Sequence, residues 1–150
     1  MSGIELNSPA FTDHTPIPAR HAKDDENVSP PLKWSRVPAD AVELALLCED
    51  PDAPSGTFVH WLMTGIDPRK DGLGAGERPQ GALEHKNGYG EEGWGGPHPP
   101  EGDDAHRYLF RLYALPAPVS LPQQPSADDV HGVLDRQQVA TATLVGLYRR

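Results

Sequence analysis

Residues 42–66 read VELALLCEDPDAPSGTFVHWLMTGI, two apolar runs separated by a short segment rich in proline and aspartate. In the first run, residues 42–48, every second side chain is apolar and shares one face, as in a β-strand. The second run, residues 57–66, is apolar on both faces. Strict alternation would place Val59, Trp61 and Met63 on one face and His60 on the other. The sequence therefore predicts two neighbouring strands, the second of them buried on both sides.

Glycine and proline indicate the fold class of the rest of the chain. The 150 residues include 15 glycines and 17 prolines, about twice the usual share. Because proline interrupts helix interiors and central strands, a helical bundle is excluded. A chain of this length, with 37% hydrophobic residues, can bury a core of its own. We expect a single, mostly β domain spanning residues 1–150.

Further elements follow residue 66. Residues 67–106 form a long irregular region, which is usually functional in a compact domain. A third strand is predicted at residues 107–115, with His106 on the same face as Tyr108. Ser126 and the acidic residues after it predict a helix over residues 127–140, and residues 144–148 form a short final strand. The aspartates at 50 and 52 and the histidines at 60 and 106 precede these last elements. Truncation after Pro125 is therefore expected to loosen the protein without removing those polar residues.

The net charge and the distribution of apolar residues argue against some classes of binding partner. With 13 basic and 22 acidic residues, the formal net charge is −9, which argues against nucleic acid or an anionic membrane as the main partner. No apolar run approaches the ~20 residues that span a bilayer, and the N-terminus lacks a signal peptide pattern. We expect a cytoplasmic protein that is not integral to a membrane. The single cysteine, Cys48, excludes an internal disulfide and is expected to be packed in the core.

Polar residues gather at the ends of the predicted strands. Asp50 and Asp52 follow the first strand, His60 lies on the second and His106 opens the third. Neighbouring strands would bring two carboxylates and two imidazoles to one small cavity. Taken singly, the aspartates suit a turn and His60 suits a hydrogen-bonded core histidine. Four further histidines are expected at the surface: His14, His21, His85 and His131.

Two classes of function remain open on these residues alone. A polar cavity serves a ligand-binding module, and glycines at 95 and 96 offer backbone N–H groups to an anion. Two aspartates and two histidines also suit a hydrolase or a metal-dependent enzyme. However, the chain has no His-x-x-x-His pattern and no Gly-x-Ser-x-Gly elbow. A stoichiometric metal in the purified protein would favour the enzyme.

Several motifs together resemble the phosphatidylethanolamine-binding protein family, also called the Raf kinase inhibitor protein family. They are DPDAP at 50–54, FVHW at 58–61, GGPHPP at 95–100 and HRY at 106–108. SPPLKW at 29–34 and LVGLY at 144–148 extend the resemblance over nearly the whole chain. The short segment between Pro54 and His60 is similar to the bacterial and archaeal branch.

This resemblance implies an antiparallel β-sandwich-like fold with a few peripheral helices, one of them near the C-terminus. It also implies a pocket for phosphate or phosphoethanolamine head groups, without a cofactor or a resident metal. The pocket maps onto Asp50, Asp52, His60, Pro99, His106 and Tyr108, with Gly96 and His98 in the adjoining loop. A histidine at 98 departs from the family at a variable position. Family members modulate kinases or inhibit serine proteases, and bacterial relatives form dimers, so these partners are expectations here.

The sequence also predicts the histidine pKa values, the charge of the ligand and the geometry of the turn beside this pocket. Carboxylates beside the imidazoles are expected to hold up the pKa values of His60 and His106 against desolvation. They also repel a bare phosphate, so the preferred ligand carries a cationic end, and Asp52→Asn should affect phosphoethanolamine and phosphate differently. The peptide bond between Ala53 and Pro54 is expected to be cis, because it lies in a tight turn beside the pocket.

Overall fold

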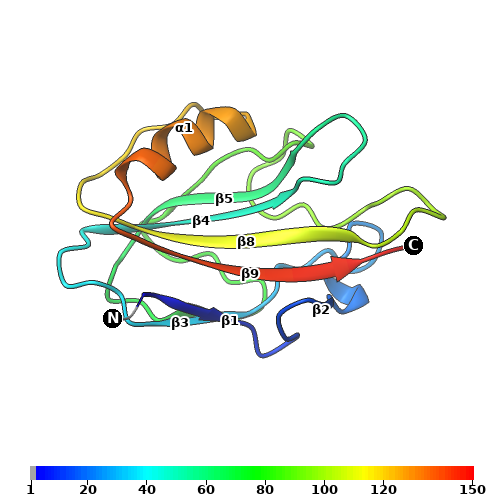
Figure 1. The fold of residues 1–150 in the computed structure, drawn as a ribbon, viewed down its shortest axis with the longest axis horizontal. Coiled ribbons are helices and arrows are strands. Elements are labelled where there is room, and N and C mark those ends of the chain that lie inside the picture. Colours follow the sequence, from blue (N-terminus) through cyan, green and yellow to red (C-terminus); the bar gives the residue numbers. More distant parts are fainter. Residues whose placement is uncertain (1–2) are drawn as a thin grey trace.

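The computed structural model describes residues 3–150 and is built mainly of β-strands (Figure 1). A mostly β fold with one α-helix near the C-terminus is confirmed. In chain order the elements are β1 (Glu5–Asn7), β2 (Thr15–Pro16), a 3-10 helix (Ala19–His21), β3 (Leu32–Ser35), β4 (Glu43–Asp50), β5 (Phe58–Ile66), β6 (Gly72–Leu73), β7 (Leu83–Glu84), β8 (His106–Leu115), α1 (Ala127–Gln137) and β9 (Ala140–Tyr148).

The strands form two sheets. The larger has the order β2-β9-β8-β4-β5-β7, and the smaller has the order β1-β3-β6. All neighbours are antiparallel except β2 and β9, which run parallel. The smaller sheet lies on one face of the larger sheet and α1 lies on the other (Figure 1). Over residues 3–150, no helix has both the length and the apolar character needed to cross a bilayer.

The main core lies between the two sheets. Leu44, Leu46 and Cys48 of β4 point into it, as their alternation predicts, and Trp34 of the smaller sheet meets them there. Val42, predicted to share this face, is instead 51% exposed because it precedes the strand. A second cluster lies beneath α1, where Val130 and Leu134 pack on the other face of the larger sheet.

The C-terminal elements differ from the prediction. The helix begins as predicted, with a reciprocal capping box between Ser126 and Asp129, but it ends at Gln137. β9 then runs from Ala140 to Tyr148 and pairs with β8 over its whole length. Its first half was missed because the Ala and Thr side chains at 140–143 give little apolar contrast. The last strand is therefore an inner strand of the large sheet, and truncation after Pro125 removes it together with α1.

Two β-bulges interrupt β5, and the predicted alternation along it was wrong. Trp61 is opposite Cys48 while Val59 is opposite Glu49, so His60 is an extra residue. A second irregularity falls at Gly65, where φ is 70°. An extra residue moves the side chains beyond it to the opposite face. Val59 and Leu62 therefore pack beneath α1, while Trp61, Met63 and Ile66 enter the main core.

Two local expectations were also wrong. The described residues contain no cis peptide bond, so the bond between Ala53 and Pro54 is trans. The turn closes instead through Gly56, whose φ is 109° and whose N–H donates to the Ala53 carbonyl at 3.1 Å. His21 and His85, expected at the surface, are buried, and their rings hydrogen-bond to the backbone carbonyls of Val28 and Pro122, respectively.

Candidate functional site

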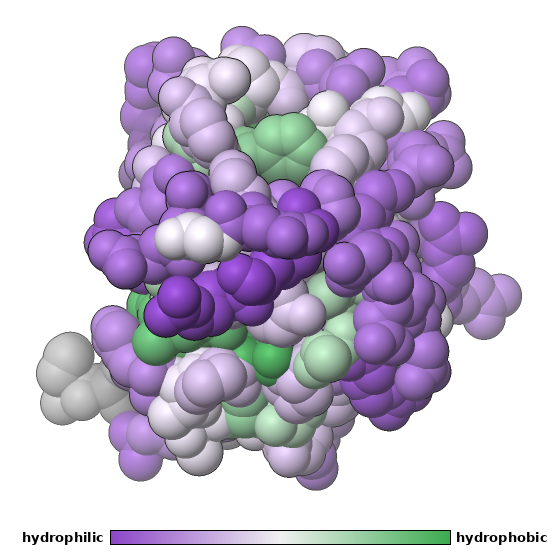
Figure 2. All heavy atoms as spheres, turned by 90° about the vertical axis from the view of Figure 1, so that its right-hand side faces the viewer, coloured by the Kyte–Doolittle hydropathy of each residue, from purple (hydrophilic) through white to green (hydrophobic). Residues whose placement is uncertain are grey.

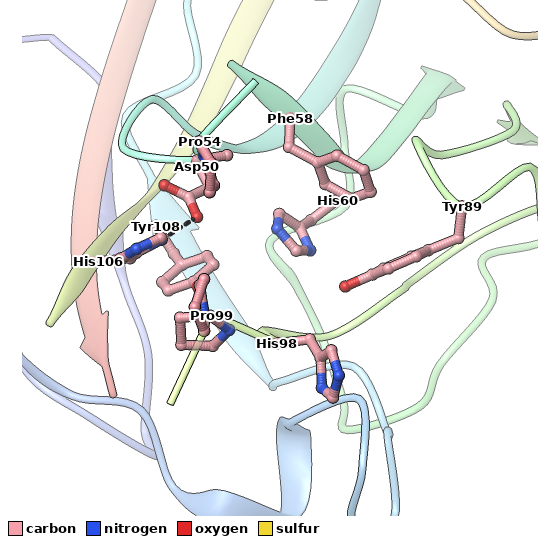
Figure 3. Close-up of a pocket in the computed structure, with 11 residues that line it drawn as sticks. Asp50, Pro54, Phe58, His60, Tyr89, His98, Pro99, His106 and Tyr108 are labelled. Carbon is pink, nitrogen blue, oxygen red and sulfur yellow. Dashed lines mark hydrogen bonds and ion pairs between the residues drawn. The ribbon is translucent and has the colours of Figure 1, made fainter. Parts of the chain in front are cut away.

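A cavity of about 160 Å³ opens where β4 ends and β5 and β8 begin (Figure 3). Six of the eight predicted site residues line it: Asp50, His60, His98, Pro99, His106 and Tyr108. The sequence prediction missed five lining residues: Ala53, Pro54, Phe58, Tyr89 and Pro100. The face of the molecule that carries these strand ends is largely hydrophilic, with apolar side chains visible in patches (Figure 2).

The sheet explains why residues far apart in sequence meet here. β4 lies between β5 and β8 and is antiparallel to both, so its last residue, Asp50, is beside the first residues of each neighbour. His106 and Tyr108 share one face of β8 by simple alternation. His60 lies on the cavity face, opposite Val59, and the bulge places Trp61 on that same face.

His106 is held between two carboxylates. Its Nδ1 donates to Asp50 Oδ2 at 2.7 Å, and its Nε2 donates to Asp103 Oδ2 at 3.1 Å. Two acceptors on one ring favour the doubly protonated imidazolium. Burial lowers the pKa of His106, but the hydrogen bonds to Asp50 and Asp103 outweigh it and raise the pKa above its usual value. The sequence prediction for this histidine is confirmed.

His60 has the opposite charge preference. Its Nδ1 lies 2.6 Å from the Gly95 carbonyl oxygen, which can only accept, so this nitrogen carries the proton. Burial lowers the pKa of His60 to about 4, and the Gly95 carbonyl offsets this only in part. The expectation that the carboxylates would hold up the pKa was wrong for His60, because burial outweighs the charge of Asp50, whose hydrogen bond is made with His106. At neutral pH, His60 is neutral and its Nε2 is an acceptor.

These two environments predict separate histidine titrations. By NMR of the imidazole ring nitrogens, His60 is expected to stay neutral from pH 8 down to about pH 4, since burial disfavours its charged form. His106 is expected to lose its proton above the ordinary histidine pKa. Asp50→Asn should lower the pKa of His106 markedly. Parallel titration of both rings near pH 6.5 would contradict these assignments.

Aromatic rings form one wall of the cavity. The Phe58 ring centroid lies 4.7 Å from those of both His60 and Tyr89. The Tyr89 hydroxyl donates to the Gly96 carbonyl at 2.9 Å, which fixes the ring. Tyr108 is fully buried, and its hydroxyl has no hydrogen-bond partner among the described residues. Burial, and then the charge of Asp50, raise the pKa of Tyr108, so it remains a neutral O–H donor.

Gly96 does not line the cavity. Its N–H donates to Asn27 Oδ1 at 2.8 Å, and a Cβ at this position would lie 2.1 Å from the His21 carbonyl oxygen. Glycine is therefore required for the close approach of two backbones. The Gly95 N–H donates to the His60 carbonyl at 2.9 Å. Since prolines have no N–H, His98 provides the only N–H in residues 96–100 without a partner in the described structure.

Asp52 also lies away from the cavity lining. Its two oxygens accept from the Arg107 guanidinium at 2.8 and 3.0 Å, and Oδ2 also accepts from the Arg107 backbone N–H at 2.9 Å. The Arg107 hydrogen bond lowers the pKa of Asp52. Asp52 thus ties the turn after β4 to the start of β8, and this contact shapes the cavity indirectly.

A metal site and a reactive thiol are two further arrangements that the residues of this chain could form. Across residues 3–150, no three His, Cys, Asp or Glu side chains are grouped so that they could hold a metal ion. Cys48 is fully buried, and burial raises the pKa of its thiol well above the usual value. Such a thiol is not a nucleophile at neutral pH.

Known proteins similar to this chain were found by sequence and by structure. The family model described as phosphatidylethanolamine-binding protein matches residues 7–149. A UPF0098 protein of Methanothermobacter thermautotrophicus is 43% identical over 152 residues, covering 98% of this chain and 99% of its own length. The crystal structure of a protein from Chlamydia trachomatis named as a phosphatidylethanolamine-binding protein homologue superposes with a TM-score of 0.88 at 33% identity, covering 100% of this chain and 99% of that one. Escherichia coli YbcL, named as a member of the same family, superposes with a TM-score of 0.90 at 28% identity and 99% coverage of both chains.

Proposed function

The chain belongs to the phosphatidylethanolamine-binding protein family, and on this premise we propose that its cavity binds a small phosphate-type anion. The observation that carries the proposal is Tyr108, which lines the cavity beside Asp50 and whose buried hydroxyl makes no hydrogen bond of good geometry within the described residues. Leaving a buried donor unpaired is costly, so such a group in a cavity supports a polar ligand.

The other cavity groups favour a partly protonated oxyanion. Tyr108 offers an O–H donor and His106 adds a positive charge, whereas neutral His60 offers an acceptor at Nε2. A hydrogen phosphate ion, or the monoprotonated head group of a phosphate monoester, has both P–O⁻ acceptors and a P–O–H donor. The cavity, at about 160 Å³, suits a group of that size with a short substituent. Phosphoethanolamine is such a monoester.

The test is calorimetric titration with inorganic phosphate at pH 6. Tyr108→Phe is expected to weaken binding about tenfold, because it removes one hydrogen bond to a charged ligand. Tyr113→Phe is the matched control, since its hydroxyl is also buried and unpartnered but Tyr113 lies on the opposite face of β8, in the cluster beneath α1. Equal affinity of the Tyr108→Phe variant and the unaltered protein would show that phosphate does not occupy this cavity.

Binding is also expected to weaken as pH rises through the folded-state pKa of His106. Protonated His106 attracts an anion, so by linkage the anion binds better to the protonated protein. The predicted regulation of a kinase or a serine protease, the cytoplasmic location and the homodimer remain predictions. No observation favours the hydrolase alternative over binding.

A further inference from the structure

The proline loop, residues 97–101, forms one side of the cavity and lies outside the helices and strands. Three of its residues line the cavity: His98, Pro99 and Pro100. Pro99 lies across the cavity from Pro54 and Phe58 (Figure 3). Three of the five loop residues are prolines, which have no backbone N–H to donate. The position of the loop therefore depends on hydrogen-bond donors that other segments supply.

Arg150, two residues beyond β9, donates to the part of the loop that lines the cavity. Its Nε donates to the Pro99 carbonyl oxygen at 2.7 Å, and its own backbone carbonyl accepts the Gly102 N–H at 3.3 Å. Its Nη1 lies 3.6 Å from Asp24 Oδ2 and 3.7 Å from Glu101 Oε1. The Arg150 guanidinium thus joins the proline loop to the turn at residues 23–26.

The hydrogen bond to Pro99 is the important one of these contacts. A hydrogen bond from an ionised donor is stronger than one between neutral groups, and the Arg150 side chain is only 23% exposed. The carboxylates of Asp24 and Glu101 are 48% and 81% exposed, so their ion pairs with Arg150 contribute little.

The other hydrogen bonds of the proline loop do not replace this contact. The Lys23 N–H donates at 3.0 Å to the Pro97 carbonyl, which precedes the residues that line the cavity. The Pro100 carbonyl accepts the Asp103 N–H at 3.3 Å, within the same turn. Among the described residues, Arg150 is therefore the only distant segment that donates to the lining part of the loop.

Resting on the proposed phosphate-type ligand, we propose that Arg150 is a positioning residue, which fixes the proline loop where the cavity can bind that ligand. Arg150 does not line the cavity, so it acts through Pro99 rather than by contact with the ligand. Without its guanidinium, the loop moves away from the cavity for part of the time, and binding must then include the cost of bringing it back.

The test is calorimetric titration of the full chain with inorganic phosphate at pH 6. Arg150→Met removes the guanidinium but keeps an unbranched side chain. It is expected to weaken phosphate binding about fivefold to tenfold, because affinity falls by the fraction of time that the loop spends in its binding position. Arg149→Met is the matched control, since Arg149 is exposed and has no hydrogen bond or ion pair of its side chain within residues 3–150. It removes the same charge and should leave phosphate binding unchanged.

Two further variants separate positioning from general stability. Arg150→Lys keeps a charged N–H donor and should bind phosphate more tightly than Arg150→Met. Leu134→Ala removes a buried side chain beneath α1, on the other face of the large sheet. It should lower the melting temperature without weakening phosphate binding, so a loss of affinity confined to Arg150→Met is not a consequence of lower stability.

The position of the loop can also be measured without a ligand. In ¹⁵N relaxation, the order parameter of the His98 amide is expected to fall from about 0.85, typical of rigid backbone, toward about 0.6 in Arg150→Met. Arg149→Met should leave it unchanged.

The outcomes distinguish this inference from the proposed function. If phosphate binding depends on Tyr108 but is the same in Arg150→Met and the unaltered protein, the binding function stands and the positioning role is wrong. The positioning role is also wrong if Arg149→Met or Leu134→Ala weakens binding as much as Arg150→Met, or if the His98 order parameter does not change. If phosphate does not bind the unaltered protein, the proposed function and this inference both fail.

Discussion

A chain that ends at Pro125 is expected to be unfolded, in contrast to the loosening that the sequence suggested. The truncation removes β9, which pairs with β8 from Tyr148 opposite His106 to Ala140 opposite Ala114. Leu144 leaves the main core, and Val130 and Leu134 leave the cluster beneath α1. The free energy of unfolding of a domain is only about 5–15 kcal/mol. The hydrophobic free energy that is lost with an inner strand and a helix is larger than this. Circular dichroism with thermal melting is the measurement.

Leu134→Ala is the control that loosens α1 but retains β9. Removing this buried side chain is expected to cost about 2–5 kcal/mol while leaving a cooperative melt at lower temperature. Phosphate binding should persist in this variant, because the cavity lies on the opposite face of the large sheet. A cooperative thermal transition in the truncated chain would show that β9 is dispensable.

A second large loss of stability is expected when an ion-paired cluster between α1 and the large sheet is broken. Glu49 is 4% exposed on its side chain, and both of its oxygens lie within 2.9 Å of His131 Nε2. His131 Nδ1 meets Asp135 at 3.0 Å, and Arg111 lies 3.7 Å from Glu49. His131→Ala leaves the buried Glu49 carboxylate with Arg111 alone, so we expect a loss of about 3 kcal/mol in the free energy of unfolding.

This loss is expected to depend on pH. Burial lowers the pKa of His131, but Glu49 and Asp135 outweigh it and raise the pKa above 6.5. A raised pKa means that the stabilisation is fully present below the unfolded-state value and is lost as pH rises through the folded-state value. In urea unfolding, the difference between the unaltered protein and His131→Ala should therefore be larger at pH 6 than at pH 9. The contribution of His106 cancels in this difference.

His14→Ala provides the comparison for a surface histidine. His14 also pairs with a carboxylate, Asp13, at 3.0 Å, but both side chains are more than half exposed. An exposed pair contributes at most about 1 kcal/mol, so its removal should change stability little at either pH. A loss for His131→Ala that is equally small, or constant from pH 6 to pH 9, would mean that the buried cluster does not anchor α1.

Alternation along β4 and β8 was sufficient to place much of the cavity from sequence. Asp50 continues the face of Leu44, Leu46 and Cys48, and His106 continues the face of Tyr108. Within an uninterrupted strand, side-chain direction depends only on residue number, so it is a local property. The strand character of residues 58–66 could also be predicted, because that run is apolar on both faces.

The orientation of the side chains after His60 required the tertiary structure. The direction of Trp61 and Met63 depends on the bulge opposite Cys48 and Glu49, and a bulge is defined by the register between two strands. The extent of β9 depended likewise on pairing, because Ala and Thr at 140–143 become a strand through β8 rather than through their own apolar pattern.

The charge states also depended on three-dimensional contacts. Asp50, Asp52 and Asp103 are equivalent carboxylates in the sequence, yet Asp50 is buried against His106, Asp52 is bound by Arg107, and Asp103 is half-exposed in the turn before β8. His60 and His106 line the same cavity, but one faces a carbonyl and the other faces two carboxylates. The sequence by itself placed Asp50, His60, His106 and Tyr108 at the cavity, but it did not find Tyr89 and it wrongly included Asp52. Only the tertiary structure decided which of them pair, because pairing depends on distances between strands and loops that have no local signal.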